Sequence, residues 1–162
     1  MSEAVTCCNL SRLHQETERT DQAIQLAETA VNICRRLGAT RRLGNGMYVL
    51  GLAYAQADRL DDATAQLSEA LGNFHENQQR FWEGQAHVRL AEMHLRAHRA
   101  DTAANHAEQA LVALRESGGD RFRATALTVL GKALSQIGQT RRARVCWREG
   151  TPHFYVFGRA GQ

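Results

Sequence analysis

Two histidines four residues apart, His94 and His98, are the first pair in this sequence that could do chemistry. On a helix this spacing places both imidazoles on one face, where they could bind a zinc ion. A His-Glu-x-x-His zinc site needs a glutamate after the first histidine, and this sequence has a leucine there. We therefore expect no metal at this pair and predict that His94 packs inside the protein. His87 and His106 are expected to be isolated.

The cysteines do not indicate catalysis either. Cys7, Cys8, Cys34 and Cys146 fit no C-x-x-C spacing, and the pattern gives no serine or cysteine a histidine partner. A Gly-x-x-x-x-Gly-Lys-Ser/Thr phosphate loop is also missing from the sequence. The sequence therefore predicts a protein that is not an enzyme and uses no cofactor or metal. Reduced thiols and the lack of a secretion pattern favour a cytoplasmic location.

Composition narrows the class of partner. The 162 residues are 43% apolar and 23% charged, with a net charge of +3, which is typical of one soluble domain. We expect no membrane contact, because no apolar run approaches the roughly 20 residues of a membrane helix. A basic block, Arg141, Arg142, Arg144 and Arg148, could meet a phosphate backbone. A solvated arginine face is the preferred interpretation, so direct nucleic-acid binding is not expected.

The elements that position these residues follow from a repeat with a period of 40 residues. Each copy has a leucine followed directly by a small residue, with an alanine thirteen positions after the leucine. The copies cover residues 3–42, 43–82, 83–122 and 123–150, and 151–162 form an apolar tail. The aligned residues are Leu10, Leu50, Leu90 and Leu130, then Ser11, Gly51, Ala91 and Gly131, then Ala23, Ala63, Ala103 and Ala143.

Each copy predicts two helices, because apolar residues recur at helical spacing on both sides of a short polar turn. Asp21, Asp61 and Asp101 are expected to cap the second helices. Neither helix of a pair can bury its apolar stripe alone, so successive pairs must stack. The predicted fold is all-α, an α-solenoid of four stacked antiparallel helix pairs. We predict helices near 4–17, 21–37, 42–57, 61–77, 81–97, 101–117, 121–137 and 141–150.

The run Leu50-Gly51-Leu52-Ala53-Tyr54, followed by Ala63, Leu67 and Ala70, resembles the tetratricopeptide repeat (TPR) family. The 40-residue period is longer than the family's common period of about 34. It is similar to repeats in actinobacterial transcriptional regulators of the SARP and STAND types. The resemblance implies a right-handed superhelix that serves as the C-terminal sensor or interaction domain of a bacterial transcriptional regulator. The chain would then be a fragment of that regulator.

The resemblance also implies a binding groove lined by the first helix of each pair. The expected ligand is a protein or peptide, or another domain of a parent regulator. The resemblance also places on these helix faces Cys8, Glu16, Val49, Val88, Thr125, Thr128 and Val129. The candidate groove residues are Asn9, Arg12, Asn45, Tyr48, Leu52, Gln56, Gln85, Arg89, Glu92, Arg96, Lys132 and Gln136.

The tail is a candidate assembly element. Proline at 152 should end the last helix, and Phe154, Tyr155 and Phe157 follow, with Trp147 before it. Either the tail covers the last pair, or two copies meet end to end as a homodimer. Two further functions stay open at this point: a free-standing scaffold or adaptor, and a sensor of small molecules or peptides.

Overall fold

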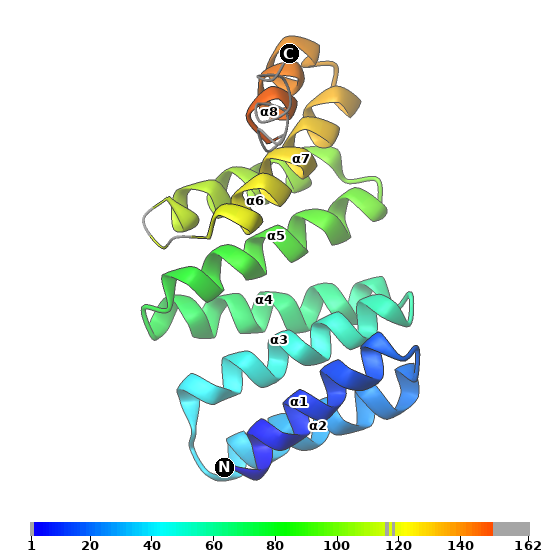
Figure 1. Cartoon of the computed structure of the whole chain (residues 1–162), viewed down its shortest axis with the longest axis vertical. Helices are drawn as coiled ribbons and strands as arrows, with labels where there is room; N and C mark the ends of the chain where they lie inside the picture. Colours follow the sequence, from blue (N-terminus) through cyan, green and yellow to red (C-terminus); the bar gives the residue numbers. More distant parts are fainter. Residues whose placement is uncertain (1, 116, 118, 151–162) are drawn as a thin grey trace, which may run out of the picture.

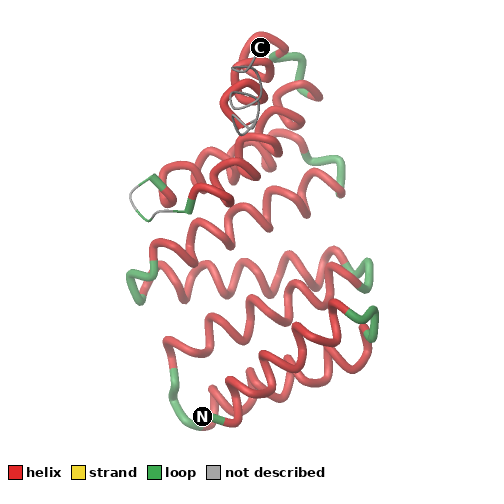
Figure 2. The backbone as a smooth tube through the Cα atoms, in the orientation of Figure 1, coloured by secondary structure: helices red, strands yellow, loops and turns green. Residues whose placement is uncertain are grey.

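The computed structural model describes residues 2–115, 117 and 119–150, and every regular element among them is an α-helix (Figure 2). The eight predicted helices are all present, with ends shifted by a few residues. The largest shift is in the sixth helix, which ends at Leu114 rather than at 117. The helices are α1 (Glu3–Glu16), α2 (Thr20–Arg36), α3 (Thr40–Gln56), α4 (Leu60–Glu76), α5 (Arg80–Arg96), α6 (Ala100–Leu114), α7 (Asp120–Gln136) and α8 (Thr140–Gly150).

The helices form four antiparallel pairs that stack along one axis, as Figure 1 shows. Within the stack, the first helix of each later pair packs on the second helix of the pair before it. First helices also meet across pairs, α1 with α3 and α5 with α7. This arrangement confirms the predicted α-solenoid of four helix pairs.

Small residues let the two helices of each pair approach closely. Ser11, Gly51, Ala91 and Gly131 are all buried, and each comes from the first helix of its pair. A Cβ atom on Gly51 would lie 2.7 Å from the Cγ atom of Leu67 on the opposite helix. The aligned alanines of the second helices are fully buried as well. The repeating small residue is therefore a packing requirement of the pair.

Leu10 is the exception in exposure among the aligned leucines. The aligned leucines of the three later pairs are buried, whereas Leu10 is 41% exposed. Each later first helix has a preceding second helix packed against it, and α1 has none in the described part of the chain. The difference therefore reflects the place of α1 at the end of the described stack.

The six turns that the structure describes in full have one geometry. The residue at position 18, 38, 58, 78, 98 or 138 has a positive φ, and only two of these six are glycines, Gly38 and Gly138. The next residue donates its backbone N–H to a carbonyl five residues back, at 2.8–2.9 Å. This is the Schellman motif, which satisfies carbonyls that a helix end leaves free.

The predicted aspartate caps were wrong. The N-cap positions of α2, α4 and α6 are Arg19, Arg59 and Arg99, and none makes a side-chain cap bond. The aspartates lie two residues later, in the first helical turn, where a carboxylate still favours the positive end of the helix dipole. The Schellman turn fixes where each of these helices begins, so the cap position falls on the arginine.

An aromatic cluster joins the second pair to the third. Phe74 of α4 is 1% exposed and stacks on Trp82 of α5, with ring centroids 6.0 Å apart. Tyr48 of α3 contacts both rings, at 6.3 Å and 6.0 Å. Phe81 extends the cluster to Phe122 of α7, at 5.9 Å. These rings supply large apolar contacts in a core that is otherwise built mainly from alanine and leucine.

Ser11→Ala should lower the free energy of unfolding by about 1 kcal/mol, as expected for one buried neutral hydrogen bond. The buried hydroxyl of Ser11 donates to the backbone oxygen of Ala23 at 2.7 Å. Urea denaturation followed by circular dichroism measures the change. Ser68→Ala, on the exposed face of α4, is the control and should shift stability by less than about 0.5 kcal/mol. Equal effects of the two changes would show that this bond does not stabilise the first pair.

Candidate functional site

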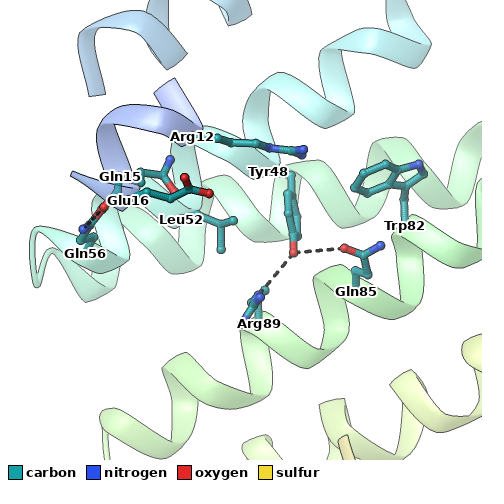
Figure 3. Close-up of a pocket in the computed structure, with 9 residues that line it drawn as sticks. All are labelled: Arg12, Gln15, Glu16, Tyr48, Leu52, Gln56, Trp82, Gln85 and Arg89. Carbon is teal, nitrogen blue, oxygen red and sulfur yellow. Dashed lines mark hydrogen bonds between the residues drawn. The ribbon is translucent and has the colours of Figure 1, made fainter. Parts of the chain in front are cut away.

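The first helices of three pairs line a hollow of about 520 Å³, shown in Figure 3. Helices α1, α3 and α5 each contribute three side chains to it. They do so because side chains three or four residues apart share one face of a helix. The lining residues are Arg12, Gln15, Glu16, Tyr48, Leu52, Gln56, Trp82, Gln85 and Arg89.

Tyr48 links α3 to α5 inside this hollow (Figure 3). Its hydroxyl accepts a hydrogen bond from Nε of Arg89 at 3.3 Å and donates to Oε1 of Gln85 at 3.5 Å. Nη1 of Arg89 also donates to Glu92 at 2.9 Å. The side chains of Tyr48, Arg89 and Glu92 therefore form one chain of hydrogen bonds. We call the bonded side chains of Tyr48, Gln85 and Arg89 the floor of the hollow, and these bonds hold it in place.

The α1 side of the hollow is polar and is tied to α3 by amides. Nε2 of Gln15 donates to the backbone oxygen of Val49 at 3.3 Å, and Nε2 of Gln56 donates to the backbone oxygen of Gln15 at 2.7 Å. Arg12 uses Nη2 for a bond to Oδ1 of Asn45 at 3.2 Å. Among the described residues, Arg12 forms no ion pair. Its guanidinium therefore keeps N–H donors for a ligand.

A second hollow of about 510 Å³ lies farther along the stack, between α5 and α7. Arg96 is fixed at its edge, because Nη1 donates to the backbone oxygen of Ala55 at 3.1 Å and Nη2 pairs with Asp58 at 2.8 Å. The Arg89–Glu92 ion pair joins the linings of the two hollows. The second hollow is lined by Glu92, Met93, Leu95, Arg96, Val129, Lys132 and Gln136.

The structure brings most of the candidate groove residues together. Six line the first hollow (Arg12, Tyr48, Leu52, Gln56, Gln85 and Arg89) and four line the second (Glu92, Arg96, Lys132 and Gln136). Asn9 is exposed and Asn45 is half-buried, and neither lines a hollow.

Sequence reasoning missed Gln15, Trp82, Met93 and Leu95 as lining residues. Helical spacing could have found two of them, because Gln15 lies three residues after Arg12 and Trp82 lies three residues before Gln85. Trp82 gives the hollow an aromatic wall beside Tyr48, with the two rings nearly perpendicular.

The histidines are arranged differently from the sequence expectation. His94 is buried, as predicted, whereas His98 is exposed in the turn that follows α5. His87 and His106 are not isolated, because their Nδ1 atoms lie 2.9 Å apart. The ring of His106 also stacks on that of His94, with centroids 5.3 Å apart. Within the described residues, no group of three His, Cys, Asp or Glu side chains could hold a metal ion.

The cysteines are placed as structural residues. Cys8 of α1, Cys34 of α2 and Cys146 of α8 are all buried. Burial raises the pKa of the Cys8 thiol to about 11, and nearby Cys34 adds to the shift. Burial also raises the pKa values of Cys34 and Cys146. These thiols therefore stay protonated at neutral pH, and a thiol is a poor nucleophile.

Of the candidate assembly residues, Trp147 alone belongs to the described part of the chain. It is 40% exposed and its indole covers Gly131 of α7. Phe154, Tyr155 and Phe157 lie outside the described residues. None of the described helices is long and apolar enough to cross a bilayer.

Two relatives of known sequence are regulatory proteins. The chain is 46% identical over 156 residues to the regulatory protein AfsR of Streptomyces griseus, covering 96% of this chain and 15% of that protein. It is 46% identical over 147 residues to AfsR of Streptomyces coelicolor, covering 91% of this chain and 15% of that protein. The chain therefore corresponds to about 15% of the length of the curated relatives it matches.

Solved structures share the fold. BtubC from P. vanneervenii superposes with a TM-score of 0.82 at 17% identity, over 98% of this chain and 68% of that chain. The apo form of RapI gives a TM-score of 0.82 at 15% identity, over 91% and 41%. Residues 2–74 match the tetratricopeptide repeat family. These residues therefore form a tetratricopeptide repeat region, and the same helix pairing continues to Gly150.

Proposed function

We propose that this chain is a non-catalytic interaction module of a bacterial transcriptional regulator, and that it binds a peptide segment of a protein partner. The observation that carries the proposal is the pair of joined hollows along α1, α3, α5 and α7. Identity of 46% to two Streptomyces regulatory proteins supports the regulatory setting. The transcriptional role and the sensor position rest on the resemblance to actinobacterial regulators.

The chemistry of the hollows favours a segment that combines an apolar side chain with a carboxylate. Leu52 and Trp82 offer apolar surface in the first hollow, and Met93, Leu95 and Val129 offer it in the second. Each hollow also has one cation without an ion pair among the described residues, Arg12 in the first and Lys132 in the second. A peptide carboxylate would accept charge-assisted hydrogen bonds from these groups.

The fixed floor of the first hollow suits this role. The Tyr48 hydroxyl is already bonded to Gln85 and to Arg89 in the free protein. A ligand therefore meets side chains that need little reordering, which lowers the entropic cost of binding.

Arg12→Ala should lower the affinity for a bound peptide by about 10- to 100-fold, as expected when a charge-assisted hydrogen bond is lost. Peptides are selected from a displayed random library on the full chain, and affinity is measured by fluorescence polarisation. Arg35→Ala is the matched control, because Arg35 is an exposed arginine of α2 that lines neither hollow. Lys132→Ala tests the second hollow in the same way. Peptides that bind Arg12→Ala and Lys132→Ala as tightly as the unchanged protein would contradict the proposal.

The regulatory setting has a separate test. We expect the gene of this chain to encode ATPase and DNA-binding domains beside the repeat module. A gene without such domains would favour the free-standing adaptor instead.

A further inference from the structure

The third helix pair carries histidines where the other pairs carry mostly apolar residues. His87 occupies the register position of Cys7, Met47 and Leu127, and His94 that of His14, Tyr54 and Leu134. On the second helix, His106 occupies the position of Leu26, Gln66 and Cys146. Positions that elsewhere hold two helices together by packing therefore carry three titratable groups in this pair. We call His87, His94 and His106 the histidine cluster.

The cluster lies between α5 and α6. Nδ1 of His87 is 2.9 Å from Nδ1 of His106, and the two ring centroids are 5.2 Å apart. A bond of this kind needs one Nδ1 that carries a proton and one that does not. If both rings were charged, two N–H groups would face each other, and the bond would become a repulsion.

His94 closes the other side of the cluster. Its ring is within 5° of parallel to that of His106, and the residue is only 8% exposed. Its Nδ1 atom is buried without a hydrogen-bond partner. A proton added to His94 would therefore create a charge with no acceptor at that nitrogen.

The charges around the cluster mostly oppose its protonation. Arg80, the first residue of α5, acts on His87, and Arg99, in the turn after α5, acts on His94. His75 of α4 acts on His87 from the neighbouring pair. The carboxylate of Glu83 favours protonation of His87, but it is already bonded to Arg80 and to His75. From α6, the titratable group that faces His87 and His94 is His106 itself. Among the described residues, no charged group of α7 acts on the three rings.

The pKa values follow this environment. Burial, followed by the charges of His87 and His94, lowers the pKa of His106 to about 4. Burial also lowers the pKa values of His87 and His94. In an opened pair each imidazole would return towards its ordinary pKa of 6.5. The opened pair therefore binds protons in a range where the closed pair does not, and this difference favours opening as the pH falls.

We propose that the histidine cluster makes the α5–α6 pair a proton-sensitive joint, closed while all three imidazoles are neutral and opened by acid. Opening would displace Gln85, Arg89 and Glu92, which α5 presents to the two hollows. The inference does not depend on the proposed peptide binding, because it concerns the contact between two helices of this chain.

The size of the effect follows from linkage. For His106 alone, with a pKa of about 4 in the closed pair and 6.5 in the opened pair, the equilibrium constant for opening rises about 30-fold between about pH 7.5 and pH 5.0. The stabilisation is fully present above 6.5 and is lost as the pH falls from 6.5 to about 4. His87 and His94 add to the change in the same direction.

The first experiment measures urea denaturation of the full chain across this pH range. His106→Gln places the residue of the second pair at this position, and His106→Leu places that of the first. In either variant, the rise of the equilibrium constant for opening between about pH 7.5 and pH 5.0 should be about 30-fold smaller than in the unchanged protein. His98→Asn is the matched control, because it removes an exposed histidine at a positive φ that asparagine tolerates. A pH dependence as large in both His106 variants as in the unchanged protein would overturn the proposal.

The second experiment locates the opening. Hydrogen exchange followed by mass spectrometry, corrected for intrinsic exchange rates, is expected to show loss of protection in α5 and α6 at about pH 5, with α1 and α2 still protected. Uniform loss along the chain, or unchanged protection of α5 and α6, would overturn the proposed joint. Because this readout needs no ligand, it stays informative whether or not peptides bind the hollows.

Discussion

Phe74→Ala is expected to lower the free energy of unfolding by about 3–5 kcal/mol, a large part of the roughly 5–15 kcal/mol of a typical domain. Phe74 is among the largest fully buried side chains of the described chain. It contacts Tyr48 of its own pair and Trp82 of the next. The truncation would therefore leave a cavity at the point where the second and third pairs meet.

The same change should also alter the shape of the transition. In a repeat stack, stability is a sum of pair stabilities and of contacts between neighbouring pairs. A weakened contact between the second and third pairs should let the first two pairs and the last two pairs unfold separately. Urea denaturation is followed both by circular dichroism and by tryptophan fluorescence, and the two curves should cease to coincide. Leu37→Ala, which truncates a side chain that is 69% exposed, is the control. A single coincident transition within about 1 kcal/mol of the unchanged protein would contradict the prediction.

Gly51→Ala and Gly72→Ala should change stability in opposite directions, although each adds one methyl group to a helix. A Cβ on Gly51 would lie 2.7 Å from Cγ and 3.0 Å from Cδ2 of Leu67, which is fully buried. We expect a loss of about 1–3 kcal/mol from overpacking. A Cβ on Gly72 meets nothing within 4 Å. There the higher helix propensity of alanine should add about 0.5–1 kcal/mol.

Thermal and urea denaturation of the two variants measure this difference directly. Each variant is the control for the other, because the chemical change and the type of secondary structure are the same. Two stabilised variants would mean that the pair can open at Gly51 without cost, and that close approach is not what the small residue provides.

The fold was predictable because the information that specifies it is local and repeated four times. An apolar stripe, a small residue and a polar turn recur in each copy, so an error in one copy is corrected by the others. The family resemblance, carried from copy to copy at the repeat period, placed Tyr48 of α3 and Arg89 of α5 in a groove, and both line the first hollow. Asn9 was placed in the groove by the same rule and is exposed instead, because α1 extends beyond the hollow at that end.

Contacts that depend on the axial offset between two packed helices were not predictable. His87 and His106 are 19 residues apart, and their Nδ1 atoms meet only because of the axial offset between α5 and α6. The aspartate caps failed for a related reason. The bonds of the Schellman turn set the first residue of each helix, and a shift of two residues moved Asp61 from the cap into the first turn.

The shared turn geometry has a consequence for how the chain acquires its structure. Every backbone hydrogen bond of the turn at Asp58, for example, joins residues no more than five positions apart. Each helical hairpin can therefore close from local contacts alone, and low contact order of this kind is associated with folding on the microsecond to millisecond scale. Since the six turns described in full share this geometry, nucleation can start at any of these hairpins and spread in either direction. The route a molecule takes would then be set by whichever pair is most stable under the conditions of the experiment.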